Sequence, residues 1–321
     1  MNVKSGGSDP LKSRNQKVYI SVVIPVYESE GFLVELVERL EAVLQTISTD
    51  FEIILVDDRS RDGSWEKIEQ LSKGKNYIKG IRLSRNFGQH RAITAGLQTV
   101  GGEWAVVMDA DLQDAPESIP LLLTKARYGY DVVLARRIGR RDAWWIRMYS
   151  KWFYGAMTYM TGIYHDPAVG NFGIYHKHVI EQVLAMREHV RYFPSMVRWV
   201  GFHQTTFDVP HSKSKGIKSN YDFRKRFQLG LMALIAFSDK PLRLTIKVGI
   251  MVSSLGFLFA LVTLFRYVNG SILVPGYASL IVSIWVLSGM ILMTLGLVGL
   301  YVGKIFEGVK NRPLFIVDKT T

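Results

Sequence analysis

Two aspartates, Asp109 and Asp111, stand one residue apart directly after an apolar run at 104–108. Such runs are typical of the buried strands of parallel sheets, since both faces of these sheets are covered. On a strand the two carboxylates would point to the same side, because side chains alternate with a period of two. Two like charges side by side repel each other unless a cation lies between them. The pair therefore predicts a site for Mg²⁺ or Mn²⁺, which prefer oxygen ligands and hold nucleotide phosphates.

The alternative for this pair is a solvated loop after a strand. Roughly one Asp-x-Asp is expected by chance in a chain of this length. The strand before the pair and Leu112-Gln113-Asp114 after it favour the metal and nucleotide site. The position agrees, because open α/β sheets bind ligands at the carboxyl ends of their strands.

Strands and helices alternate through the first half of the chain. Apolar runs predict strands at 18–27, 51–56, 78–83, 104–108 and 131–137. Helical spacing or a capped polar turn predicts helices at 32–47, after 64 and at 88–100. This order predicts an α/β fold with a mainly parallel sheet and helices on both faces.

The predicted strand ends carry further polar residues. They would bring Pro25, Tyr27, Asp57 and Asp58 to the same edge as the acid pair, where a nucleotide should lie. The fifth strand would deliver Arg136, Arg137, Arg140 and Arg141 into the loop that follows it.

Aromatic and basic residues are interleaved in two later segments. Segment 144–154 has three tryptophans with Arg147 and Lys151, and segment 223–237 opens with three basic residues before an apolar helical face. Both suit helices at a membrane interface, where bases meet lipid phosphate. An ordinary core helix is the alternative for 144–154, although tryptophans beside fixed charges are hard to bury.

Two long apolar runs, 244–268 and 277–302, close the chain, and the second contains no charge. Each exceeds the roughly 20 residues that a transmembrane helix needs. The alternative is two buried helices of a soluble domain, but such helices rarely run so long without polar residues. Loop 269–276 has no Lys or Arg while the flanks are rich in them. The positive-inside rule therefore places the large domain and both termini in the cytosol.

Composition limits the class of protein. The 321 residues include 40 Lys+Arg and 28 Asp+Glu, for a formal net charge of +12. This balance suits anionic lipid or phosphate-bearing substrates better than nucleic acid, for which no recognition motif is visible. There is no cysteine, and therefore no disulfide or thiolate metal site. Residues 1–17 are polar, lack the apolar core of a signal peptide and are expected to be a disordered tail.

Four motifs follow one another along the chain: Val-Val-Ile-Pro-Val-Tyr (22–27), Leu-Val-Asp-Asp-Arg-Ser-Arg-Asp-Gly-Ser (55–64), Leu-Ser-Arg-Asn-Phe-Gly (83–88) and Met-Asp-Ala-Asp-Leu-Gln-Asp-Ala-Pro-Glu (108–117). With the apolar tail, this set resembles the polyisoprenyl-phosphate glycosyltransferases of glycosyltransferase family 2. That group includes dolichyl-phosphate mannose synthase and bactoprenol glucosyltransferase. The resemblance implies a GT-A fold, which is Rossmann-like with a mainly parallel sheet.

The resemblance also implies substrates and site residues. The donor would be a nucleotide-sugar, weighted by the family toward UDP, and the acceptor a polyprenyl phosphate such as undecaprenyl phosphate. Asp109, Asp111 and Gln113 would hold Mg²⁺ or Mn²⁺ and the diphosphate. Arg137, Arg140 and Lys218 would contact phosphates of the donor or acceptor, although a solvated charge run is the alternative for Lys218. The family pattern places nucleotide contacts at Pro25, Tyr27, Glu28, Asp57, Asp58, Asp109, Ala110, Asp111 and Lys218.

Three departures from the family pattern stand out. Glu28-Ser29 replaces the usual Asn-Glu, so either Glu28 or Glu30 would take over the acidic role or the nucleotide contact is lost. Asn171 stands where the family often has an aspartate that has been considered a catalytic base. The lysine of Lys218-Ser219 comes one residue early.

A missing base is compatible with a single inverting displacement. A phosphate monoester has its second pKa near 6, so the acceptor is already largely dianionic and needs no proton removed. Asn171 would then bind a sugar hydroxyl or the phosphate. Two other functions remain open: a processive polysaccharide synthase of the same fold, and a membrane-anchored nucleotide-sugar-binding protein without turnover.

The expected organisation has five parts. They are a disordered tail (1–17), a GT-A catalytic domain (18–221), an interfacial amphipathic helix (222–243), two transmembrane helices (244–303) and a cytoplasmic tail (304–321). The resemblance implies a multi-pass protein of the bacterial cytoplasmic membrane that modifies cell-envelope glycans, and tetramers occur among relatives.

Overall fold

The computed structural model describes residues 18–138, 155, 158, 166, 168–186, 188, 191–210, 240–269 and 276–321. The N-terminal tail, the segments 144–154 and 223–237, Arg140 and Lys218 lie outside these residues. Their predicted roles therefore stay predictions.

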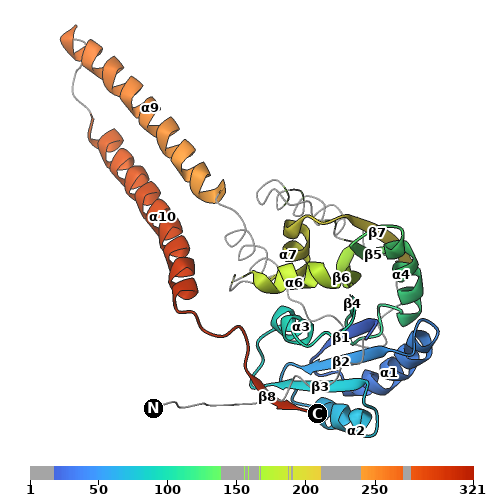
Figure 1. Cartoon of the computed structure of the whole chain (residues 1–321). Coiled ribbons are helices and arrows are strands. Elements are labelled where there is room, and N and C mark those ends of the chain that lie inside the picture. The colour runs from blue at the N-terminus through green and yellow to red at the C-terminus, as the bar shows by residue number, and fades with distance from the viewer. Residues whose placement is uncertain are drawn as a thin grey trace, which may run out of the picture.

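A sheet forms the centre of the α/β domain (Figure 1), and the described residues give it the order β7-β5-β6-β4-β1-β2-β3-β8. Its strands are β1 (Ile20–Val26), β2 (Phe51–Asp57), β3 (Ile78–Leu83), β4 (Trp104–Val107), β5 (Val132–Ile138), β6 (Val169–His176), β7 (Gln204–Pro210) and β8 (Val317–Thr320). β4, β1, β2 and β3 are mutually parallel, β6 is antiparallel to both β4 and β5, and β8 is antiparallel to β3. The prediction of a mainly parallel sheet is confirmed.

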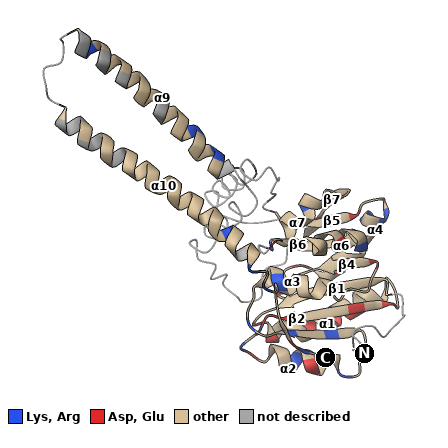
Figure 2. Cartoon of the chain, turned by 60° about the vertical axis from the view of Figure 1, so that its left-hand side comes forward, with Lys and Arg blue, Asp and Glu red and all other residues tan. Residues whose placement is uncertain are grey.

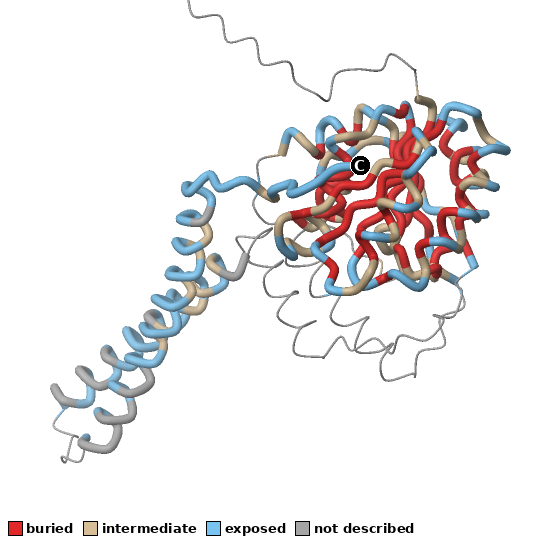
Figure 3. The backbone as a smooth tube through the Cα atoms, turned by 90° about the horizontal axis from the view of Figure 1, so that it is seen from below, coloured by how far each residue is buried: buried red, intermediate tan, exposed pale blue. Residues whose placement is uncertain are grey.

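Helices cover both faces of this sheet, as predicted. One face packs against α1 (Glu30–Gln45), α2 (Ser64–Ser72) and α4 (Ile119–Arg127), which follows the short helix η1 (Pro116–Ser118). The other packs against α3 (Gln89–Leu97), α6 (Lys177–Ala185) and α7 (Phe193–Val200). Side-chain alternation explains the two cores: Val22 lies on the α1 face and Val23 on the α3 face. Among the residues that the structure describes, the buried ones lie in this domain (Figure 3).

Two long helices, α9 (Lys240–Val268) and α10 (Tyr277–Val309), lie side by side and project away from the domain (Figures 1 and 2). Their windows Leu242–Phe259 and Leu287–Phe306 have mean hydropathies of 1.6 and 1.8, and 0% of either window is buried. Both helices are long and apolar enough to cross a membrane, as the two apolar runs predict. A hairpin of this kind would leave a large apolar surface in water without a bilayer.

The segment 304–321, expected as a tail, has structure of its own. It contains the end of α10 and the strand β8, which returns to the domain and pairs with β3. Neither β8 nor the strands β6 and β7 were identified from sequence.

Candidate active site

The candidate site lies at the carboxyl ends of β1, β2, β4 and β5. These strands point the same way, because β5 and β4 are each antiparallel to β6 between them. The amino-terminal end of β6, with Asn171, therefore reaches the same edge. Tyr27 and Glu28 follow β1 and are exposed, whereas Pro25 is buried within the strand. A nucleotide at this edge could contact Tyr27 and Glu28 directly.

The acid pair lies in a turn after β4. The strand ends at Val107, so Asp109 and Asp111 are beyond it, and strand alternation is not what orients them. Instead Leu112 adopts a positive φ of 59°, and the N–H of Gln113 donates to Oδ1 of Asp111 over 3.1 Å. Such a side-chain turn is typical of aspartate. Ala110 is buried in this turn, so its contact with a nucleotide stays a prediction.

Negative charge is concentrated around Asp109. Burial, followed by the charges of Asp114 and Asp111, raises the pKa of the Asp109 carboxyl to about 6. Its side chain still keeps 25% of its surface exposed. Burial also raises the pKa of Asp111. Three acids within electrostatic range disfavour the ionised state, so a bound cation would relieve their repulsion.

Three side chains surround the carboxylate of Asp109. Nε2 of Gln89 donates to Oδ1 over 2.7 Å, and Nδ2 of Asn171 donates to the same oxygen over 3.4 Å. An Arg137 nitrogen lies 3.8 Å from Oδ2. Gln89 was missed by the sequence analysis, although it directly follows the Leu-Ser-Arg-Asn-Phe-Gly motif at the start of α3. Asn171, which stands where the family often has an aspartate, thus donates a hydrogen bond to the carboxylate of Asp109.

Arg137 is held by Asp114 through two parallel hydrogen bonds. Nε and Nη2 donate to Oδ1 and Oδ2 over 3.0 and 2.9 Å. Burial by itself lowers the pKa of the Arg137 guanidinium, but the carboxylate of Asp114 outweighs this effect, so the pKa is raised. The neighbouring Arg136 points to the opposite side of β5 and pairs with Asp208 over 2.6 Å at the surface. Of these two arginines, the structure brings Arg137 to the acid pair.

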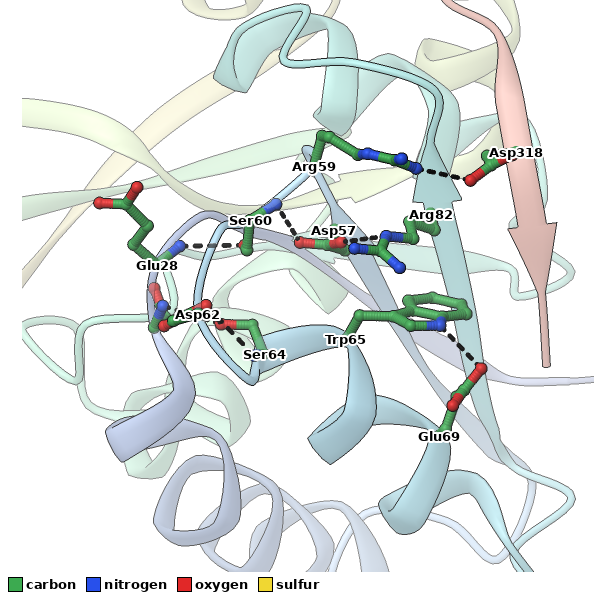
Figure 4. A network of polar contacts seen from close by, with 11 residues as sticks. Glu28, Asp57, Arg59, Ser60, Asp62, Ser64, Trp65, Glu69, Arg82 and Asp318 are labelled. Atoms are coloured by element: carbon green, nitrogen blue, oxygen red, sulfur yellow. Dashed lines mark hydrogen bonds and ion pairs between the residues drawn. The ribbon is translucent and has the colours of Figure 1, made fainter.

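The carboxylates of Asp57 and Asp58 both bind groups of the protein itself. Oδ1 and Oδ2 of Asp58 accept from the N–H groups of Phe87 and Gly88 over 2.7 and 2.8 Å, and burial raises the pKa of Asp58. Asp57 is fully buried, accepts from the N–H of Ser60 over 2.9 Å and lies 3.2 Å from Nε of Arg82 (Figure 4). Buried carboxylates need such partners. Both acids therefore fix the loops of the site, and a direct nucleotide contact stays a prediction.

The loops after β1 and β2 are joined to each other (Figure 4). Glu28 has a positive φ of 50°, and its N–H donates to Oγ of Ser60 over 3.0 Å. The N–H of Ser29 donates to Oγ of Ser64 over 3.1 Å. The unusual Glu28-Ser29 pair therefore has a structural role: Ser29 is buried in this junction and the Glu28 side chain remains exposed.

Asp109, Asp111 and Gln113 are the side chains that would bind the implied divalent ion. In the part of the chain that the structure describes, no group of three or more His, Asp or Glu side chains could hold an ion. Mg²⁺ typically uses one or two carboxylates and completes its octahedron with water and substrate phosphate. Asp109 and Asp111, with Gln113 beside them, fit that mode of binding better than a closed protein cage.

A sheet with parallel core strands and an acid pair at their carboxyl edge is the arrangement of the GT-A glycosyltransferases. Residues 21–226 match the family model described as Glycosyl transferase family 2. The chain belongs to this family and is a glycosyltransferase.

Relatives resemble the chain over nearly its whole length. It is 34% identical over 307 residues to the uncharacterized glycosyltransferase YkcC of Bacillus subtilis, covering 95% of each chain. It is 35% identical over 307 residues to the undecaprenyl-phosphate 4-deoxy-4-formamido-L-arabinose transferase of Photorhabdus laumondii, covering 94% of this chain and 93% of the relative. A crystal structure of a mycobacterial protein has a TM-score of 0.50 at 15% identity, covering 68% of this chain and 75% of that one, which shows the fold alone.

Proposed function

We propose that the protein is a membrane-anchored inverting glycosyltransferase. It transfers a hexose from a nucleotide-sugar, a UDP-sugar, to a polyprenyl phosphate such as undecaprenyl phosphate. The reaction takes place on the cytosolic face of the membrane and serves the modification of cell-envelope glycans. Support for the acceptor class comes from the relatives named for transfer to undecaprenyl phosphate.

The observation that carries this proposal is where the apolar hairpin joins the sheet. α10 ends at Val309 and β8 begins at Val317. β8 enters beside Leu83 and Ser84, at the carboxyl end of β3. Residues 310–316 can span at most about 25 Å, at about 3.5 Å per residue. The hairpin is therefore connected, through this short segment, to the edge of the sheet that carries the acid pair, where a lipid phosphate could reach it.

Membrane anchoring also explains the exposed apolar surface of α9 and α10. Holding the enzyme in the plane of its lipid acceptor raises the effective concentration of that acceptor. The basic residues beside both helices suit the cytosolic side of a bilayer (Figure 2).

In this mechanism Asp109, Asp111 and Gln113 hold the divalent ion, Mg²⁺ or Mn²⁺. When bound, the ion supplies positive charge that stabilises the departing nucleoside diphosphate. The fixed guanidinium of Arg137 adds charge at the same place without reorganisation, since Asp114 already orients it.

The attacking group is an oxygen of the lipid phosphate, which is largely dianionic at neutral pH and needs no base. It displaces the diphosphate from the anomeric carbon in one step, which inverts the configuration there. Asn171 is compatible with this step, because the protein is not required to remove a proton. Its amide instead helps to orient Asp109. Arg140 and Lys218 complete the proposal as phosphate ligands.

The test uses the full chain in membranes, with labelled UDP- and GDP-sugars, undecaprenyl phosphate and Mn²⁺. We expect label from one donor to move into the organic phase, and Asp111→Ala to prevent this. Label retained on the protein without lipid product would favour the binding protein without turnover. A polymeric product would favour a processive synthase. Transfer by the parent without any divalent ion would refute the metal role of the acid pair.

A further inference from the structure

The last seven residues, 315–321, return from the hairpin and complete the edge of the sheet (Figure 1). β8 pairs with β3 in the register Ile81 to Thr320 and Leu83 to Val317. At one end the N–H of Ser84 donates to the carbonyl of Ile316 over 2.9 Å. At the other, the N–H of Thr321 donates to the carbonyl of Gly80 over 3.0 Å, and its Oγ1 accepts from the N–H of Gly80 over 2.8 Å. Contacts thus run from Gly80 to Ser84, along the carboxyl-terminal part of β3.

Two side chains add to this backbone pairing. Phe315 packs against the core under α3. Asp318 pairs with Arg59 over 2.6 Å (Figure 4). Since these charged side chains are 38% and 44% exposed, the ion pair contributes little. The strand pairing and the partly buried ring of Phe315 are the stronger attachments.

The docked segment lies beside two loops of the candidate site. Loop 84–88 continues directly from β3, and the N–H groups of Phe87 and Gly88 in it are bound by Asp58. Arg59 follows Asp58 in the loop after β2. Asp58 therefore joins the loop after β2 to the loop after β3. The segment 315–321 contacts both of these loops or the strand that leads into them, through β3 and through Arg59.

We propose that residues 315–321 are a positioning element of the donor site, which holds the loops 57–64 and 84–88 in place from the membrane side. This inference rests on the proposed function, because it assigns the donor to that edge. Without the segment β3 would be an edge strand, and its backbone groups would lose their partners. The loop that begins at Ser84 would then lose its attachment on one side, which leaves the pairing of β3 with β2 and the two hydrogen bonds to Asp58.

The test compares Lys319→Pro with Lys319→Ala in the full chain in lipid nanodiscs. Proline removes an N–H from β8 and disrupts strand pairing, whereas alanine keeps the backbone at this exposed position. A chain that ends at Leu314 is the second variant. Binding of UDP and of GDP with Mn²⁺ is measured, together with amide hydrogen exchange of the two loops.

We expect Lys319→Pro and the shortened chain to bind the nucleoside diphosphate about tenfold more weakly, and their loops 57–64 and 84–88 to exchange faster, with the exchange of α9 and α10 unchanged. Lys319→Ala should match the parent. Equal affinity in all variants would overturn the inference, even if exchange increases, because the segment would then only stabilise the sheet. If the parent binds neither UDP nor GDP, the proposed function fails, and loop exchange still decides whether the segment holds these loops.

Discussion

The pair formed by Arg137 and Asp114 offers the sharpest test of how the site is built. The side chain of Asp114 is 1% exposed and that of Arg137 is 22% exposed. Replacing Arg137 with alanine would leave a buried carboxylate without its charged partner. Removing one partner of a buried pair typically costs about 3–5 kcal/mol. Because the partial exposure of Arg137 lets water reach the vacated space, we expect a cost near the lower value, about 3 kcal/mol.

A matched control lies one residue away. Arg136 makes a similar two-bond contact with Asp208, but both side chains are about half exposed, at 45% and 46%. Exposed pairs contribute about 0–1 kcal/mol. Arg136→Ala should therefore leave the midpoint of thermal unfolding close to that of the parent.

The assay is thermal unfolding of the full chain in detergent. In a domain of this size about 1 kcal/mol shifts the midpoint by roughly 2–4 °C, so Arg137→Ala should lower it by about 6–12 °C. Asp114→Asn removes the charge but keeps the shape. The double variant Arg137→Ala/Asp114→Asn should lose less than the sum of the two single changes, since each removes the same interaction.

Two results would refute this reasoning. One is a midpoint for Arg137→Ala within 2 °C of that for Arg136→Ala, which would mean that burial adds nothing to the pair. The other is strict additivity in the double variant, which would show that the two side chains act independently.

Three further outcomes are expected. Asp111→Ala should abolish transfer while leaving the midpoint and membrane association unchanged; parental turnover that still requires a divalent ion would remove Asp111 from the metal role. Gln89→Ala should raise the Mn²⁺ concentration for half-maximal activity severalfold at unchanged stability, because Gln89 is exposed and orients Asp109; equal Mn²⁺ dependence would contradict this. Burial lowers the pKa of His90 from 6.5 to about 4. As the pH falls from 6.5 to 4, His90 is protonated in the unfolded chain but stays neutral in the folded chain. The free energy of unfolding therefore decreases over this range. The unfolding free energy of His90→Gln should therefore decrease by about 2 kcal/mol less than that of the parent over this pH range. If the unfolding free energies of parent and variant depend on pH in the same way, His90 does not contribute to the decrease.

Several elements could be located from sequence alone because their burial leaves a pattern. β1 to β4 are apolar on both faces, and the predicted runs agree with them to within two residues. The apolar helices α9 and α10 were found for a related reason, since each contains a long apolar run that few polar residues interrupt. The motif after β4 indicated an acid pair at the carboxyl edge, and the structure has it there.

Other elements leave no such pattern. β7 lies at the edge of the sheet and has one buried residue among its seven, and all four residues of β8 are exposed. Because an exposed edge strand need not be apolar, neither strand could be recognised from hydrophobic periodicity.

By itself the sequence determined the layered α/β domain, the apolar hairpin and the place of the acid pair, because burial must be encoded in residue type. Only the tertiary structure decided which polar groups meet. Arg137 binds Asp114 across 23 positions, Asp58 binds Phe87 across 29, and Arg59 meets Asp318 across 259. Hydrophobic periodicity reports which face of an element is buried, but it carries no information about the partner on the other side. Those partners follow from strand order and register, which are set by the packing of the whole domain.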